Sequence, residues 1–291
     1  MVKLDYTFKN DTLFKMLFVK YPDLLKRLVA KLLNIKLESI DDFIITNPEM
    51  PPENIKDKFC RLDINMSING QKADLEIQVA NEGDYPERSL YYWAREYSTA
   101  LDEGRDYKEL PRTILISIVA FKMFNCKEFH SEFALFEVTR HTQLTDKQSL
   151  HYFELTKLPE VIDREDELKL WLTLFRAETE EQLKQIELLE VPIMEQAIEA
   201  YRHITATEEF QEIERLRSRA RHNEAAALRH AAEVEREKWQ DLIAQKDASL
   251  AQKDVSLAQK DATLALKDTA LAQKEAEIAE LRAKLQQNGE L

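Results

Sequence analysis

Residues 61–80 read RLDINMSINGQKADLEIQVA, two stretches of alternating apolar and polar residues joined by Asn69-Gly70. Such alternation predicts two half-buried β-strands, and Asn-Gly between them is the strongest short-range signal for a hairpin. A two-residue turn also fixes the register, because it places Ile68 opposite Gln71 and determines every later pair.

This register gives the predicted hairpin one apolar face and one polar face. The apolar face pairs Leu62 with Ile77, Ile64 with Leu75 and Met66 with Ala73. The polar face pairs Arg61 with Gln78, Asn65 with Asp74 and Asp63 with Glu76. The apolar face is expected to pack against the rest of the protein.

Asp63 and Glu76 are the informative pair, since their Cβ atoms would lie roughly 5 Å apart. Two like charges at that distance repel by about 1 kcal/mol in water and roughly 3 kcal/mol at an effective dielectric near 20. A hard divalent cation would offset this repulsion, and Mg²⁺ is commonly held by one or two carboxylates plus waters and phosphate. The alternative interpretation is a solvated polar face, where scattered acids are ordinary.

Composition divides the 291-residue chain into an N-terminal part rich in aromatic residues and strand-like runs, and a last hundred residues rich in Ala, Glu, Gln, Lys and Arg. The net charge of -13 argues against wrapping nucleic acid with the whole surface, so a DNA contact would use a local patch. Cys60 and Cys126 lack CxxC spacing and indicate reduced thiols rather than a zinc site. With no signal-peptide core or membrane-span pattern, we expect a soluble, cytoplasmic protein.

The order of predicted elements indicates an α/β fold with a mixed sheet flanked by helices. Helices are predicted at 11–19, from Pro22 to about Asn34, and from Pro86 to Gly104; strands are predicted at 43–45, 61–68, 71–80, 112–121, 134–140 and 151–158; the remainder is helical. We expect the domains to be 1–160, a helical region at 161–240, and a heptad-repeat helix or coiled coil at 241–291.

Asp63 followed by Glu76-Ile77-Gln78 resembles the PD-(D/E)xK nuclease core. The segments FKNDTLFKMLF (8–18), LEIQV (75–79), RSLYYWAREYSTALDEGRDYKEL (88–110) and FELTKL (153–158) are similar to the Rpn family of recombination-promoting nucleases and related transposases. The resemblance spans roughly residues 5 to 160. It implies a restriction-endonuclease-like sheet and a metal-dependent endonuclease acting on double-stranded DNA.

The resemblance also implies roles for individual residues. Asp63 and Glu76 would hold Mg²⁺, or alternatively Mn²⁺, with the backbone carbonyl of Ile77. Gln78 stands where most of the superfamily has Lys, and it supplies a hydrogen bond but no charge to the attacking water or the phosphate. Asp11 matches a position where the superfamily often adds an acid near the metal. A second ion would require a further ligand, for which Asp11 and Asp74 are the candidates.

Several other features have structural interpretations beside the functional ones. Arg88 matches the family pattern and is a candidate DNA contact, on a helix whose Tyr and Trp residues more often serve packing. The six histidines have no metal-binding spacing and are expected to be structural or exposed. The basic run at Arg215, Arg217, Arg219 and Arg221 is interspersed with Glu and favours a solvated helix over a phosphate-binding edge.

From Ala244 the chain repeats every seven residues, with Leu250, Leu257, Leu264, Leu271, Ile278 and Leu285 in one stripe. The repeat predicts a helix about 54 Å long that forms a coiled coil. The stripe is thin, because Lys and Asp follow most of the Leu residues where a second apolar seam would lie. Weak self-association, a helical partner and a solitary helical spacer therefore all remain open.

The first function expected is thus a Mg²⁺-dependent DNA endonuclease that promotes recombination or is related to transposases, and that assembles through residues 241–291. The second is a weakly active or inactive nuclease-like module that binds DNA or regulates it and oligomerises through the same helix. The third is an interaction protein in which the coiled coil is the functional part and the polar face of the hairpin is only solvent surface.

Overall fold

The computed structural model describes residues 2–47, 64–101, 104 and 106–287. Within that part of the chain, six strands form one mixed sheet in the order β1-β2-β3-β4-β6-β5. The strands are β1 (Phe43–Ile45), β2 (Ile64–Ile68), β3 (Gln71–Gln78), β4 (Thr113–Val119), β5 (His130–Phe133) and β6 (Gln148–Glu154). Strands β3, β4 and β6 are parallel to one another, and the other neighbouring pairs are antiparallel. The predicted α/β class with a mixed sheet is confirmed.

The helices begin and end close to the positions that the sequence predicts for the N-terminal half. They are α1 (Asp11–Lys20), α2 (Pro22–Leu32), α3 (Tyr85–Ser98), α4 (Glu167–Arg176), α5 (Glu180–Glu187), α6 (Pro192–Thr205) and α7 (Glu208–Gln287), with short 3₁₀ helices η1 (Leu37–Ser39), η2 (Tyr107–Glu109) and η3 (Leu155–Lys157). Helix α1 begins where the side chain of Asn10 accepts a hydrogen bond from the Leu13 amide. Helix α2 begins at Pro22, which needs no amide partner there.

The central hairpin forms with the predicted turn and register. Asn69 and Gly70 both have positive φ, 50° and 75°, as a two-residue hairpin turn requires. Ile68 lies opposite Gln71, and the register continues through Met66 with Ala73, Asn65 with Asp74 and Ile64 with Leu75. The predicted pairs of Arg61, Leu62 and Asp63 lie outside the described residues.

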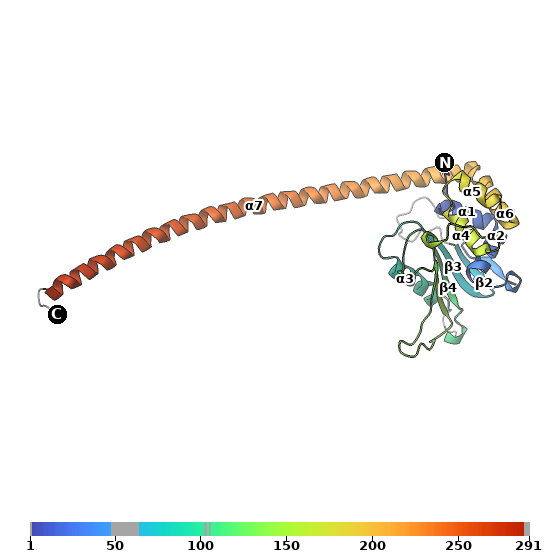
Figure 1. Ribbon diagram of the computed structural model, residues 1–291, viewed down its shortest axis with the longest axis horizontal. Helices are drawn as coiled ribbons and strands as arrows, with labels where there is room; N and C mark the ends of the chain where they lie inside the picture. Colours follow the sequence, from blue (N-terminus) through green and yellow to red (C-terminus); the bar gives the residue numbers. More distant parts are fainter. Residues whose placement is uncertain (1, 48–63, 102–103, 105, 288–291) are drawn as a thin grey trace. The chain divides into compact units, whose positions relative to one another are not determined.

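The two faces of the sheet are covered differently. One face packs on α1, α2, α4, α5 and α6, which gather on the same side (Figure 1), through a large core that includes Ile64, Leu75 and Ile116. The opposite face meets α3 through a smaller cluster of Tyr85, Leu115, Val119, Leu150 and Tyr152. Helix α3 connects the parallel strands β3 and β4, and it therefore lies over the polar face of the hairpin.

Three predicted elements have different bounds in the structure. The strand predicted at 151–158 is β6, which begins earlier, at Gln148, because its pairing with β4 starts there opposite Thr113. Residues Leu155–Lys157 form η3 instead of continuing that strand. Helix α3 ends at Ser98 rather than continuing to Gly104, and the hydroxyls of Ser98 and Thr99 bond to the Arg95 carbonyl at 2.9 and 3.0 Å, a local alternative to further helix. Residues 134–140 do not form the predicted strand. The chain instead turns at His141, which has a φ of 54°, and β5 is formed by the preceding residues.

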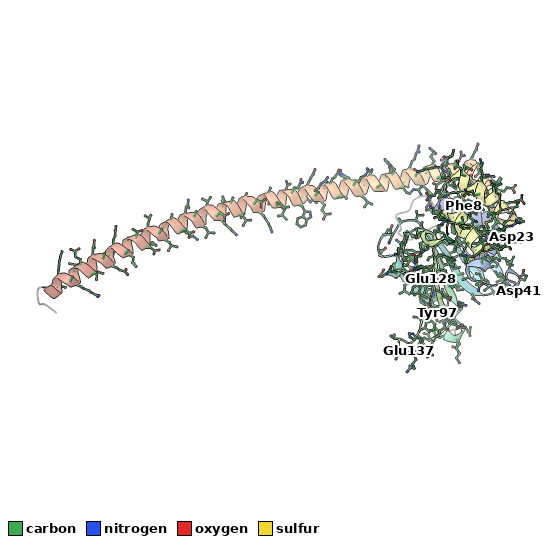
Figure 2. All side chains as sticks on the ribbon, viewed as in Figure 1. Phe8, Asp23, Asp41, Tyr97, Glu128 and Glu137 are labelled. Atoms are coloured by element: carbon green, nitrogen blue, oxygen red, sulfur yellow. The ribbon has the colours of Figure 1, made fainter. Side chains whose placement is uncertain are left out.

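The chain divides into two compact units, Met1–Arg219 and Ala220–Leu291. In the first unit, α6 packs on α1 and α4 packs on α2, so the helices after residue 160 belong to the same body as the sheet. The described residues of the second unit form one uninterrupted helix. Its side chains stand out around the helix (Figure 2), and almost all of those described are exposed. In the described residues, none of the helices combines the length and the apolar character that crossing a membrane requires.

Candidate functional site

Glu76 is a carboxylate held inside the protein near the end of the central strand β3. Its residue surface is only 5% exposed, although it lies on the polar face of the hairpin. The Tyr85 hydroxyl donates a hydrogen bond to Glu76 Oε2 at 3.0 Å, and the same hydroxyl is bonded to Ser117 Oγ at 2.9 Å. Glu76 therefore does not lie on a solvated face, and its carboxylate has a fixed neighbour.

Tyr85 is itself fixed by the elements around it. It is fully buried at the first turn of α3, next to Pro86, with edge-on ring contacts to Phe121 and Tyr152. The guanidinium carbon of Arg88 lies 5.1 Å from the centre of the Tyr85 ring. Burial, followed by the charge of Glu76, raises the pKa of the Tyr85 phenol well above its usual value. The phenol thus remains a hydrogen-bond donor at physiological pH.

Gln78 and the carbonyl of Ile77 lie at the carboxyl end of β3. Gln78 is in register with Val119 of β4, which is in register with Glu154 of β6, so three parallel strands end together. The Gln78 amide nitrogen donates to the Ala80 carbonyl at 3.1 Å. The Gln78 backbone carbonyl accepts a hydrogen bond from the Ala120 amide, on the side of β3 that faces β4. Because successive carbonyls of a strand point in opposite directions, the carbonyl of Ile77 points to the side that faces β2.

Asp63, the predicted partner of Glu76, lies outside the described residues. Among the residues described, no cluster of three or more His, Cys, Asp or Glu side chains is arranged to hold a metal ion. The Glu76 carboxylate and the Ile77 carbonyl are nevertheless hard oxygen donors of the kind that Mg²⁺ accepts. The described residues therefore fit part of a Mg²⁺ site and need at least one further acidic ligand.

Asp11, the additional acid expected near a metal, forms an ion pair with the basic run on α7. Arg217 Nη2 lies 3.0 Å from Asp11 Oδ2, and the Arg217 side chain is only 14% exposed. The adjacent carboxylate of Glu214 is buried and accepts from Thr12 Oγ1 at 2.5 Å and from Asn10 Nδ2 at 3.0 Å. The first turns of α7 are thus tied to the start of α1, which the sequence pattern alone did not indicate.

Asp74 and Arg88 lie on the same side of the sheet as Glu76. Asp74 is two residues before Glu76 on β3 and is paired with Asn65 and Leu115. Arg88 forms an ion pair with Glu82 besides its contact with the Tyr85 ring, and its side chain is 14% exposed. Arg88 therefore supports Tyr85, and its contact with DNA stays a prediction.

His130 and His151 form a pair that the sequence spacing did not suggest. His130 Nε2 lies 3.1 Å from His151 Nδ1, the ring planes differ by 7° and the ring centres are 5.4 Å apart. The two nitrogens therefore point at each other along one line, which is hydrogen-bond geometry rather than two ligands converging on a metal. The other ring nitrogen of His151 bonds to Ser149 Oγ at 2.7 Å. Burial lowers the pKa of His151 to about 4.

Sequence reasoning missed Tyr85 and Ser117 as neighbours of Glu76. A signal for Ser117 exists, since it is a hydroxyl in the middle of the buried apolar strand TILISIV. Such a residue needs a polar partner on its own face of the sheet. Tyr85 has no comparable signal, because a Tyr before a helical Pro is common in packing.

The fold and the buried acid on its central strand correspond to the class of PD-(D/E)XK nucleases. A family model described as PD-(D/E)XK nuclease family transposase matches residues 8–231 of the 291, and the chain belongs to this family. The resemblance to nucleases and transposases seen in the sequence is therefore confirmed. No curated protein and no solved structure matches the chain.

Proposed function

We propose that this protein is a Mg²⁺-dependent endonuclease that hydrolyses phosphodiester bonds of double-stranded DNA in the cytoplasm and promotes recombination. Membership of a nuclease and transposase family supports the general class of reaction. The observation that carries the proposal is the buried Glu76 carboxylate, fixed by Tyr85 on the central strand. A buried acid with a dedicated donor is costly to a purely structural sheet and useful at a metal site.

Asp63, Glu76 and the backbone carbonyl of Ile77 are the proposed ligands, with Asp11 or Asp74 as the additional acid. Mn²⁺ is an alternative to Mg²⁺, since both accept carboxylate, carbonyl and water oxygens. When bound, such an ion lowers the pKa of a coordinated water and neutralises charge on the phosphate oxygens. The ion pair with Arg217 holds Asp11 in place and would have to open or be shared for Asp11 to act as a ligand.

The chain's own residues provide orientation. Tyr85 keeps one Glu76 oxygen fixed through its neutral hydroxyl. The side-chain nitrogen of Gln78 donates a hydrogen bond to the Ala80 carbonyl. The side-chain oxygen of Gln78 would therefore accept a hydrogen bond from the attacking water. Arg88, which lies over the Tyr85 ring, is the proposed contact to the DNA backbone.

The test is nicking of supercoiled plasmid with and without Mg²⁺ by the full chain and by variants with conservative amides. Asp63→Asn and Glu76→Gln should each lower cleavage by at least about a hundredfold, because each loses a charged ligand. Glu87→Gln, which changes an exposed acid on α3, is the matched control and should cleave like the wild type. Equal cleavage by the wild type and both ligand variants would reject the nuclease proposal.

Gln78 favours a second candidate, a nuclease-like module that binds DNA with little or no cleavage. A neutral amide cannot supply the charge that Lys gives at this position in most of the superfamily. Gel-shift binding to duplex DNA without Mg²⁺-dependent nicking would support this candidate. In that case Gln78→Lys should raise cleavage. If the wild type is instead an active nuclease, cleavage already proceeds with Gln at position 78.

Self-association through residues 241–291 is proposed for the second unit. The leucines of its stripe, Leu250, Leu257, Leu264 and Leu271, are each more than half exposed. They recur every seven residues on one uninterrupted helix, so a second copy could cover them over the whole length of the repeat. The charged residues that follow each Leu predict an association weaker than that of a full leucine zipper.

A further inference from the structure

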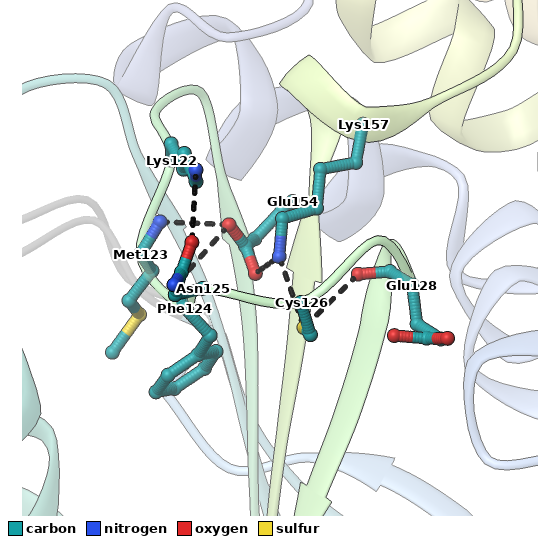
Figure 3. A network of polar contacts seen from close by, with 8 residues as sticks. All are labelled: Lys122, Met123, Phe124, Asn125, Cys126, Glu128, Glu154 and Lys157. Atoms are coloured by element: carbon teal, nitrogen blue, oxygen red, sulfur yellow. Dashed lines mark hydrogen bonds and ion pairs between the residues drawn. The ribbon is translucent and has the colours of Figure 1, made fainter.

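A network of polar contacts ties the loop after β4 to the end of β6 (Figure 3). Glu154, the last residue of β6, is 1% exposed, and its Oε1 lies 2.5 Å from the ammonium nitrogen of Lys157. Its Oε2 accepts from the amides of Met123 at 2.7 Å and Phe124 at 3.4 Å. The carboxylate therefore has a cation and two amide donors in a water-poor environment.

Cys126 is the remaining member of this network. The Lys157 ammonium group donates to Cys126 Sγ at 3.2 Å, and the thiol donates to the Glu128 carbonyl at 3.6 Å (Figure 3). Lys157 is only 9% exposed at its side chain, whereas Cys126 is partly exposed. Among the described residues, Cys126 forms no disulfide. The thiol of a partly exposed residue thus lies against a cation that is paired with a buried acid.

We propose that Cys126 is an oxidation site for peroxides and that Lys157 holds the oxidised sulfur. The nuclease proposal makes no use of these residues, and the inference stands independently of it. Reactive cysteines are characterised by a neighbouring cation and partial exposure, and both are present here. The specific feature is that the Lys157 ammonium group beside the sulfur belongs to a largely buried side chain and is paired with the buried Glu154 carboxylate.

The reaction is a two-electron oxidation of sulfur by hydrogen peroxide. A sulfur–oxygen bond forms as the oxygen–oxygen bond breaks, and the departing hydroxide combines with the thiol proton, which gives a sulfenic acid and one water. A second peroxide converts the sulfenic acid into a sulfinic acid and a second water. The sulfinic acid releases its proton, and its anionic oxygens then lie beside the Lys157 ammonium group.

Oxidation should also change the loop that the network anchors. A sulfinate at Cys126 would share Lys157 with Glu154, which also receives the Met123 and Phe124 amides. Phe124 packs on Tyr152 with ring centres 5.4 Å apart, and Tyr152 contacts Tyr85 at 6.4 Å. The loop is therefore connected through two aromatic contacts to the residue that fixes Glu76.

The test uses the full chain with Cys60 replaced by Ala, so that Cys126 is its sole thiol. Peroxide is added, samples are quenched over time, and intact mass with peptide mapping measures the addition of one and two oxygen atoms. The double variant Glu154→Gln/Lys157→Gln removes both charges together and avoids an unpaired buried acid. It should oxidise at least about tenfold more slowly than the parent. Lys122→Gln, whose ammonium group bonds Asn125 Oδ1 in the same loop, is the control and should oxidise at the parent rate.

Equal oxidation rates in the parent and the folded double variant would overturn the proposal. If circular dichroism shows that the double variant does not fold, the parent chain is compared in buffer and in denaturing urea. The folded thiol should then react at least about tenfold faster than the unfolded one, because only the folded chain places Lys157 beside it. A folded thiol that reacts at the same rate as the unfolded thiol, or more slowly, would also overturn the proposal.

Discussion

Replacing Tyr85 with Phe removes the hydroxyl that fixes Glu76 and leaves the aromatic ring in its packed position. The lost hydrogen bond joins the Tyr85 hydroxyl to Glu76 Oε2 at 3.0 Å, and Glu76 is only 5% exposed. Hydrogen bonds to charged groups contribute about 1.5 to 3 kcal/mol, and about 1.4 kcal/mol corresponds to a tenfold change in an equilibrium constant. Tyr85→Phe should therefore weaken metal binding by about 10- to 100-fold, the range seen when residues behind metal ligands are changed.

The effect can be measured without relying on cleavage. Loss of the free Mn²⁺ signal in electron paramagnetic resonance gives the dissociation constant, and plasmid nicking gives the Mg²⁺ concentration for half-maximal activity. Both should shift in the same direction by similar factors. Tyr91→Phe is the matched control, because Tyr91 is on the same helix and is 58% exposed. Its binding constant should equal that of the wild type.

The pH dependence provides an independent check on the same bond. Because the pKa of Tyr85 is raised, its hydroxyl keeps its proton through the neutral and mildly alkaline range. Titration of Tyr85 should therefore cause no loss of wild-type Mn²⁺ affinity between about pH 7 and pH 9.5. If Tyr85→Phe binds Mn²⁺ within twofold of the wild type, the hydroxyl does not position a metal ligand. If Tyr91→Phe weakens binding equally, the effect belongs to α3 as a whole.

Three further predictions concern other parts of the molecule. His151 has a pKa of about 4 in the folded protein against 6.5 in a free side chain, so the unfolded chain binds a proton more readily as the pH falls. The free energy of unfolding, measured by urea titration, should therefore fall by about 2 to 3 kcal/mol between pH 7 and pH 4.5. The variant His151→Gln should lack this dependence. Arg217→Gln and Asp11→Asn break the same partly exposed ion pair and should each lower the free energy of unfolding by less than about 1 kcal/mol, but only Asp11→Asn should reduce nicking; equal nicking by both variants would leave Asp11 a structural role alone. A chain ending at residue 240 should keep the thermal melt of the first unit and lose self-association in light scattering, and an unchanged mass per particle would reject assembly through 241–291.

The hairpin shows how much of the fold could be predicted from the sequence. Asn69 and Gly70 accept positive φ, and the period of two in the flanking segments allows one register with a consistent apolar face. Where local sequence competes with tertiary context, prediction was less accurate. The segment 134–140 has strand-like composition, yet the edge strand β5 is formed by His130–Phe133 and the chain turns at His141.

The sequence predicted only some residues of the candidate site. Glu76 and Gln78 follow from strand alternation and the family resemblance, whereas Tyr85 and Ser117 come from α3 and β4 and meet Glu76 only because β3 and β4 are parallel neighbours. The ion pair of Asp11 joins residues more than 200 positions apart. No local pattern encodes such a contact.

The sequence by itself determined the α/β class, the central hairpin and its register, and the long heptad-repeat helix, because these depend on periodicity and on turn residues that are local. Only the tertiary structure decided that the polar face of the hairpin is covered by α3, that Glu76 is buried beside Tyr85, and that the start of α7 is tied to α1. Those features arise from which surfaces meet in the folded chain, and burial changes the electrostatics of a side chain in a way that its sequence neighbours do not reveal.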